Sequence, residues 1–178
     1  MKPIRPTKRI TVLLAEDHTI VREGLRTLLQ AEGDLEVIGE ADTGRQAVDL
    51  TKKLHPAVVV MDIAMPQLNG LEATRQIRKA VPDTKVLILS AHSDDAYVEQ
   101  MVALGAVGYL LKQTSAHFLA EAIREIHQGR TFFSPSIARR MQNRAARTVP
   151  PSTMSKGKSE PMSSREVEVR NGPQNSDQ

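Results

Sequence analysis

The chain contains Ala57-Val58-Val59-Val60-Met61-Asp62, a short apolar run that ends in a carboxylate. Continuous apolar residues rich in Val are typical of a strand that is buried on both faces of a parallel sheet. The next segment, residues 63–70, contains Pro66 and Gly70 and is predicted to be a loop. We therefore expect Asp62 to lie where a buried strand leaves the sheet.

Four further segments have strand character, at residues 10–15, 35–40, 85–89 and 107–111. The stretches that follow them place apolar residues at helical spacing, so that strands and helices alternate along the chain. This alternation predicts an α/β fold in which a doubly wound, five-stranded parallel sheet carries helices on both faces. Residues 8–130 are enough to build it.

Polar side chains end three of these other strands: Glu16 and Asp17, Ser90, and Lys112. Ligands of doubly wound sheets bind at the carboxyl ends of the strands. We therefore expect these groups to converge with Asp62 on one rim of the sheet.

The three acidic residues of this rim, Glu16, Asp17 and Asp62, predict a cation site. Neighbouring carboxylates raise one another's pKa unless a cation neutralises them, and oxygen ligands with room for water suit Mg²⁺. The alternative for Glu16 and Asp17 is that they favour the positive end of the following helix.

Asp62 is the candidate nucleophile, because an ionised carboxylate can attack phosphorus and form an acyl phosphate. Lys112 can stabilise charge on the transferring oxygens, and the Ser90 hydroxyl can donate a hydrogen bond to the new phosphoryl group. The alternatives are a turn-forming Asp, a solvated Lys and a capping Ser. Tyr109 is either half-buried packing or a movable aromatic side chain beside the site.

With these motifs in place, residues 8–130 resemble the receiver domain of bacterial two-component response regulators. The residues from Glu16 to Leu25 are similar to the NarL/FixJ class, whose output domains are LuxR-type helix-turn-helix domains. The matching segments are Leu14-Ala15-Glu16-Asp17-His18, Met61 to Gly70, Leu89-Ser90-Ala91-His92 and Gly108-Tyr109-Leu110-Leu111-Lys112.

The resemblance implies a flavodoxin-like receiver fold with strand order 2-1-3-4-5. It implies that Asp62 accepts a phosphoryl group from a sensor histidine kinase, with Ser90 and Tyr109 moving as a switch and Lys112 contacting a phosphoryl oxygen. It also implies a homodimer on phosphorylation, and no enzymatic activity beyond self-phosphorylation from a donor and autodephosphorylation. The implied Mg²⁺ ligands are Glu16, Asp17, Asp62 and the backbone carbonyl of Ala64.

The C-terminal part differs in character. Residues 131–146 are predicted to form a basic linker helix, and residues 147–178, rich in Pro, Ser and Lys, a disordered tail. Residues 162–169 resemble the start of a LuxR-type DNA-binding domain, but no apolar periodicity follows. We therefore expect no sequence-specific DNA binding, whether the chain is ended early, frameshifted or natively short.

The amino-acid composition excludes several classes of protein. The chain has no Cys, which excludes disulfide scaffolds and thiolate chemistry. It shows no signal peptide or membrane-spanning run, so a cytoplasmic protein is expected. Residues 1–130 carry 16 basic and 17 acidic side chains, so the small positive charge belongs to the tail and does not imply a nucleic-acid partner.

Three other functions remain open at this stage. The first is a stand-alone receiver that acts as a phosphate relay or sink. The second is a small Mg²⁺-dependent phosphohydrolase with an Asp nucleophile, although the nearest acidic residue after Asp62 is Glu72. The third, a flavodoxin-like cofactor binder, is disfavoured by loops without a Gly-rich cradle and by the absence of Trp.

Overall fold

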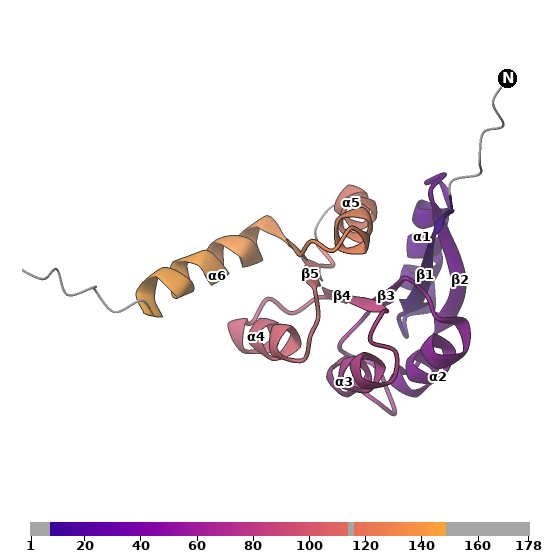
Figure 1. Cartoon of the computed structure of the whole chain (residues 1–178), viewed down its shortest axis with the longest axis horizontal. Helices are drawn as coiled ribbons and strands as arrows, with labels where there is room; N and C mark the ends of the chain where they lie inside the picture. The colour runs from indigo at the N-terminus through magenta and orange to yellow at the C-terminus, as the bar shows by residue number, and fades with distance from the viewer. Residues whose placement is uncertain (1–7, 114–115, 149–178) are drawn as a thin grey trace, which may run out of the picture.

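The computed structural model describes residues 8–113 and 116–148. These residues form one parallel sheet of six strands in the order β2-β1-β3-β4-β5-β6. Figure 1 labels the first five strands of this order. The predicted order 2-1-3-4-5 is confirmed, with one strand added at the edge. The strands are β1 (Ile10–Ala15), β2 (Leu35–Ala41), β3 (Val58–Met61), β4 (Lys85–Ser90), β5 (Gly108–Leu111) and β6 (Phe132–Phe133).

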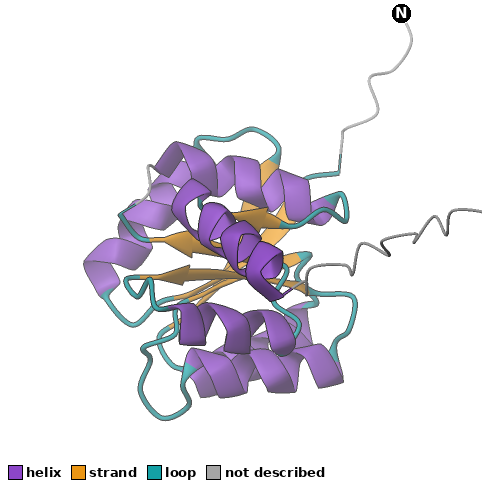
Figure 2. Ribbon diagram, turned by 90° about the vertical axis from the view of Figure 1, so that its left-hand side faces the viewer, coloured by secondary structure: helices purple, strands orange, loops and turns teal. Residues whose placement is uncertain are grey.

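Helices cover both faces of the sheet, as the unbroken apolar strands require (Figure 2). One face is covered by α1 (Thr19–Gln30) and α5 (Ala116–His127). The other is covered by α2 (Gly44–Leu54), α3 (Gly70–Ala80) and α4 (Asp95–Ala103). The doubly wound α/β fold predicted from the sequence is therefore confirmed.

Local sequence explains where the helices beside the rim begin. The Thr43 side chain accepts a hydrogen bond from the Gln46 amide at the start of α2, and Asn69 does the same for Glu72 at the start of α3. At Gly70 a Cβ atom would lie 2.2 Å from the carbonyl oxygen of Asp62, so a glycine is required there. This close approach packs α3 directly against the end of β3.

The sixth strand is the difference between the predicted and observed sheets. The Phe132 amide donates to the Val107 carbonyl at 3.1 Å, and the Ser134 amide to the Tyr109 carbonyl at 3.0 Å. Two residues are too few to show a strand pattern in sequence, and Phe132 and Phe133 were predicted to belong to the linker helix. The pairing is favoured because it satisfies backbone groups along the open edge of β5.

The helix α6 (Pro135–Thr148) begins four residues after the start of the segment predicted as a basic linker helix, residues 131–146, and ends two residues beyond it. Its first half packs on the domain, because Ile137 is only 1% exposed and Met141 contacts the same apolar core as α4. The boundary between the receiver domain and a linker stays a prediction.

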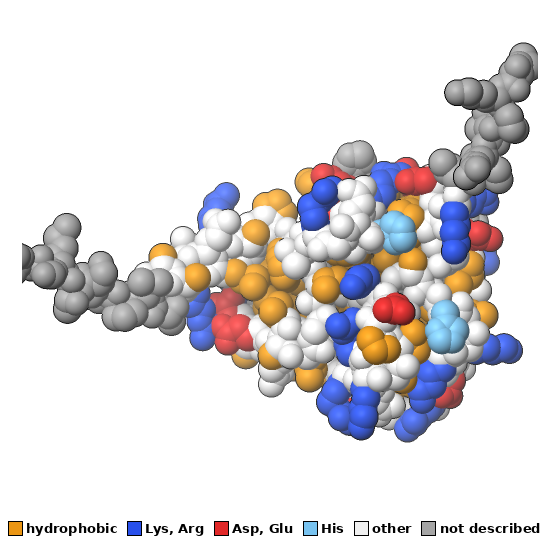
Figure 3. All heavy atoms as spheres, viewed as in Figure 1, with side chains coloured by type: hydrophobic (Ala, Val, Ile, Leu, Met, Phe, Trp, Pro, Cys, Tyr) orange, Lys and Arg blue, Asp and Glu red, His pale blue; other side chains and the backbone are white. Residues whose placement is uncertain are grey.

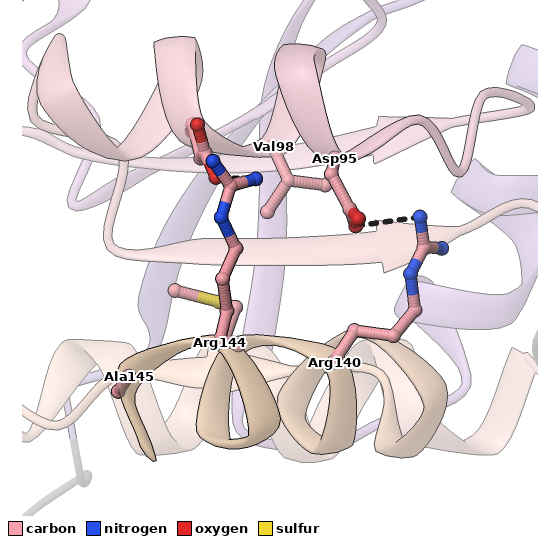
Figure 4. A pocket seen from close by; sticks show the side chains of 7 residues that line it. Asp95, Val98, Arg140, Arg144 and Ala145 are labelled. Atoms are coloured by element: carbon pink, nitrogen blue, oxygen red, sulfur yellow. Dashed lines mark ion pairs between the residues drawn. The ribbon is translucent and has the colours of Figure 1, made fainter. Parts of the chain in front are cut away.

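Two ion pairs join α6 to α4. Arg140 Nη2 lies 2.5 Å from Asp95 Oδ1, and one turn further on Arg144 pairs with Glu99 (Figure 4). Acidic and basic side chains accordingly lie side by side where the two helices meet (Figure 3). Between the helices is a hollow of ≈ 230 Å³, open to solvent and floored by Val98.

Among the described helices, none is both long and apolar enough to cross a membrane. The predicted tail and the segment 162–169 lie outside the described residues, apart from the last two residues of α6.

Replacing Ile137 by Ala is expected to reduce the free energy of unfolding by about 2–5 kcal/mol, because it empties a buried apolar site. The exposed Arg139→Ala on the same helix is the matched control, with an expected change within about 0.5 kcal/mol. Urea unfolding measures both. Equal midpoints for the two variants would show that α6 is not part of the cooperative unit.

Candidate functional site

The predicted rim residues do converge at one edge of the sheet. Glu16 and Asp17 follow β1, Asp62 follows β3 and Lys112 follows β5. One ligand atom each from Glu16, Asp17, His18 and Asp62 lies within 4.8 Å of the others. The register of the parallel strands contributes to this cluster, since β1 and β3 end at the same level, with Ala15 opposite Met61. β4 and β5 run two residues beyond that level and end with Ser90 opposite Leu111.

Backbone hydrogen bonds hold the first residue after each strand. The Glu16 amide donates to the Ala41 carbonyl at 3.0 Å, and the Asp62 amide donates to the Ala15 carbonyl at 2.9 Å. The Lys112 amide donates to the Ser90 carbonyl at 2.8 Å. Each site residue is therefore fixed by the sheet itself rather than by a free loop.

Lys112 lies between two buried carboxylates. Its Nζ is 2.6 Å from Glu16 Oε2 and 3.2 Å from Asp62 Oδ2. The side chains of Glu16 and Asp62 are 3% and 4% exposed and that of Lys112 is 21% exposed, so both ion pairs are partly shielded from water. The alternative of an ordinary solvated lysine does not describe this geometry.

His18 is part of the cluster, although no role was predicted for it from the sequence. Its Nδ1 lies 2.9 Å from Glu16 Oε1 and 3.1 Å from Asp17 Oδ1. The hydrogen bond to Glu16, followed by the charge of Asp17, raises the pKa of the exposed imidazole. The available sequence signal was its position directly after the acidic pair.

Burial and neighbouring charges shift the pKa values of Glu16 and Asp62 in opposite directions. Burial, followed by the negative charge of Glu16, raises the pKa of Asp62 above its ordinary value, and Lys112 offsets this only in part. Burial also acts to raise the pKa of Glu16, but Lys112 and His18 outweigh it and hold the pKa low. Burial acts to lower the pKa of Lys112, whereas the two carboxylates outweigh it and raise that pKa.

The donor set fits a hard divalent cation. Glu16 Oε2, Asp17 Oδ1 and Asp62 Oδ2 are buried without a hydrogen bond of ordinary geometry. Their close contacts are the ion pairs to Lys112 and His18. Three carboxylates against one lysine leave negative charge that a cation of the Mg²⁺ type can neutralise through oxygen ligands.

The Asp62 side chain also shapes the loop that follows β3. Its Oδ1 accepts a hydrogen bond from the Ala64 amide at 3.3 Å. This contact is the turn predicted as the ordinary alternative for Asp62, and it coexists with the ion pair to Lys112. The role of the Ala64 carbonyl as a metal ligand stays a prediction.

Ser90 ends β4 opposite Leu111, and Tyr109 lies two residues earlier on the neighbouring β5. Both side chains are fully buried. The Ser90 Oγ accepts a hydrogen bond from the His92 amide at 3.0 Å, and the Tyr109 hydroxyl donates to the His92 carbonyl at 2.7 Å. The His92 ring stacks on Tyr97 of α4, with ring centroids 5.5 Å apart. Both predicted switch residues therefore contact the one loop that joins the rim to α4.

The chain is similar in sequence to known proteins. Residues 12–124 match the response regulator receiver domain family. The transcriptional regulatory protein DegU of Brevibacillus brevis is 41% identical over 129 residues, which cover 72% of this chain and 55% of DegU. The uncharacterised transcriptional regulatory protein YxjL of Bacillus subtilis is 38% identical over 161 residues, 90% of this chain and 73% of YxjL.

A solved structure of a LuxR-family two-component response regulator from Aurantimonas sp. SI85-9A1 superposes with a TM-score of 0.75 at 34% identity. It covers 78% of this chain and 99% of its own. The chain spans little more than half the length of DegU. From its fold, the site at the strand ends and these matches, the protein belongs to the two-component response regulators of the LuxR/NarL family.

Proposed function

We propose that Asp62 is the phosphoacceptor of this response regulator and that a sensor histidine kinase is the donor. The observation that supports this most is a buried carboxylate paired with a partly exposed ammonium group beside two further carboxylates, all at strand ends. Such an arrangement concentrates a nucleophile and compensating positive charge where phosphoryl oxygens have to lie.

In the proposed transfer, an Asp62 carboxylate oxygen attacks phosphorus while the bond from phosphorus to the donor nitrogen breaks. The electron pair of that bond leaves with the donor imidazole, and an acyl phosphate remains on Asp62. Lys112, already 3.2 Å from Asp62 Oδ2, would pair with an oxygen of the new group. Its ion pair to Glu16 holds the ammonium in place before the reaction.

The proposed ligands of Mg²⁺ are Glu16, Asp17, Asp62 and the carbonyl of Ala64. When bound, the ion supplies positive charge for the carboxylates and the transferring oxygens. The unsatisfied carboxylate oxygens support this proposal, since a buried acceptor without a donor is costly. A cytoplasmic location is likewise proposed, from the family.

Glu72 does not fit the acid–base role that the rival phosphohydrolase function requires of a carboxylate close after the nucleophile. Glu72, the first acidic residue after Asp62, is engaged by Arg75 at 2.5 Å and by Gln76 at 2.8 Å on the surface of α3. The pKa of Glu72 is lowered to about 2 by these partners, Arg75 first, so it is a poor proton donor. A relay or phosphate sink uses the same Asp62 chemistry and differs only in its partner.

We propose that the output runs through α4 and α6. A phosphoryl group on Asp62 would draw the Ser90 hydroxyl, which now bonds the His92 amide. The Tyr109 hydroxyl holds the carbonyl of the same His92, and the Tyr109 carbonyl accepts from Ser134, directly before α6. A changed loop can therefore alter both the α4–α6 contact and a dimer surface.

Incubation with Mg²⁺ and a small acyl phosphate is expected to add one phosphoryl group, detected by intact mass. Asp62→Asn should remove the adduct, because the amide is not a nucleophile, and Lys112→Ala should slow its formation. Asp83→Asn, an exposed aspartate in the α3–β4 turn, is the matched control. An adduct that persists in Asp62→Asn would contradict the assignment.

Without a divalent cation, Asp62→Asn is expected to unfold at a higher temperature than the wild type at neutral pH. Because the pKa of Asp62 is raised on folding, the ionised carboxylate disfavours the folded state. The wild type should therefore lose stability relative to the variant as pH rises from the ordinary carboxyl pKa to the raised one, and the two should converge in acid.

Mg²⁺ should stabilise the wild type more than Asp62→Asn, since it binds the folded state. Scanning calorimetry across pH, with and without the ion, measures both effects. A variant less stable than wild type at neutral pH without Mg²⁺ would contradict the electrostatic account.

Phosphorylation is expected to change the distance between α4 and α6. The chain has no Cys, so Val102→Cys and Asn143→Cys, both exposed, place two unique spin labels. The distance distribution should shift or broaden with the acyl phosphate and stay unchanged when Asp62→Asn is added. An unchanged distribution in protein that carries the phosphoryl group by mass would rule out this output path.

A further inference from the structure

Arg22 is a basic side chain near the start of α1 whose place there is not explained by the helix itself. The N-terminal end of a helix carries partial positive charge and favours acidic rather than basic residues. In α1 no acidic residue occupies the first turn, and the N-cap His18 makes no side-chain capping bond. A cation at this position therefore depends on contacts outside the helix.

Those contacts go to the loop that carries the acidic pair and to the neighbouring strand. Arg22 Nη1 donates to the backbone carbonyl of Glu16 at 2.6 Å. On its other side, Arg22 Nε lies 3.7 Å from Glu40 Oε1 on β2. The side chain is only 17% exposed, so these contacts are partly shielded from water.

The Glu16 residue is thus held from two directions. Its amide donates to the Ala41 carbonyl at the end of β2, while its carbonyl accepts from Arg22 on α1. The Glu16 carboxylate is left to Lys112 and His18. The guanidinium fixes the backbone of the acidic pair without taking a carboxylate oxygen.

We propose that Arg22 is a positioning residue that sets the affinity of the Glu16–Asp17 pair for Mg²⁺. The inference rests on the proposed function of the site. Glu16 and Asp17 repel each other and Asp62, so a loop without the Arg22 contact would relax to separate them. The cation would then have to order that loop on binding, at a cost in conformational entropy.

The test is a Mg²⁺ titration of the full chain, followed by the amide NMR shifts of residues 16–18. Arg22→Gln is expected to raise the Kd by about tenfold or more, the usual effect of removing an outer-shell partner of a metal site. Arg22→Lys, which keeps the charge and one donor, should recover part of the affinity. Phosphorylation from the acyl phosphate at saturating Mg²⁺ should stay within about threefold, because the reacting groups are intact.

Arg26→Gln is the matched control. Arg26 lies one turn further along α1 and pairs with the same Glu40, at 3.6 Å, and no contact between it and Glu16 is found. Its removal deletes the same charge from the same helix and should leave the Kd unchanged. Circular dichroism and unfolding in the presence of a chelator show whether each variant is folded.

The outcomes separate the two levels of the proposal. Wild type that binds no Mg²⁺ overturns the proposed metal site and the role of Arg22 together. Wild type that binds Mg²⁺ with the same Kd as Arg22→Gln overturns the role of Arg22 alone. Equal weakening in Arg22→Gln and Arg26→Gln also overturns it, since that would be a general charge effect. If Arg22→Gln does not fold, Arg22→Lys is compared with wild type, and equal affinity overturns the proposal.

Discussion

Glu16 and Asp62, whose side chains are buried, share the ammonium group of the partly exposed Lys112. With Asp17, this is an arrangement of three carboxylates and one lysine in which the lysine cannot satisfy every oxygen. Burying unbalanced charge is costly, and a bound cation would offset that cost at this site. The sheet tolerates this because its backbone hydrogen bonds fix the three strand ends.

Hydrogen bonds also link the strand ends at this rim to the loop that precedes α4. Ser90 on β4 and Tyr109 on the adjacent β5 both form hydrogen bonds with the His92 backbone, and the His92 ring stacks on Tyr97 of α4. A change in charge at Asp62 therefore has a short physical route to a helix surface. Burial raises the pKa of Tyr109, so its hydroxyl keeps its proton and remains a hydrogen-bond donor.

The folded domain includes two elements beyond the predicted five-stranded sheet and its helices, namely β6 and α6. β6 pairs with β5, and Ile137 of α6 enters the core between the sheet and α4. The ion pairs of Arg140 and Arg144 then fasten α6 to α4. These contacts pack α6 against the folded domain that contains α4.

Much of this could be predicted from the residues alone. Unbroken apolar strands such as residues 57–61 indicate burial on both faces, and alternation with helices then leaves few topologies. Polar residues at strand ends must meet at one edge of a parallel sheet, which is why Glu16, Asp62 and Lys112 could be placed together in advance. The helix at Ser134-Pro135 was also visible, from its capping chemistry.

Other features depend on long-range contacts that leave no local pattern. β6 is two residues long, and it forms because the edge of β5 is open beside it. Nothing near Arg22 in the sequence shows that its guanidinium donates a hydrogen bond to the Glu16 carbonyl or forms an ion pair with Glu40. The sequence by itself determined the fold class and the chemistry of the rim, because both follow from periodicity and strand ends. Only the tertiary structure decided which charges are paired and which remain unsatisfied, because pairing depends on distances between segments far apart in the chain.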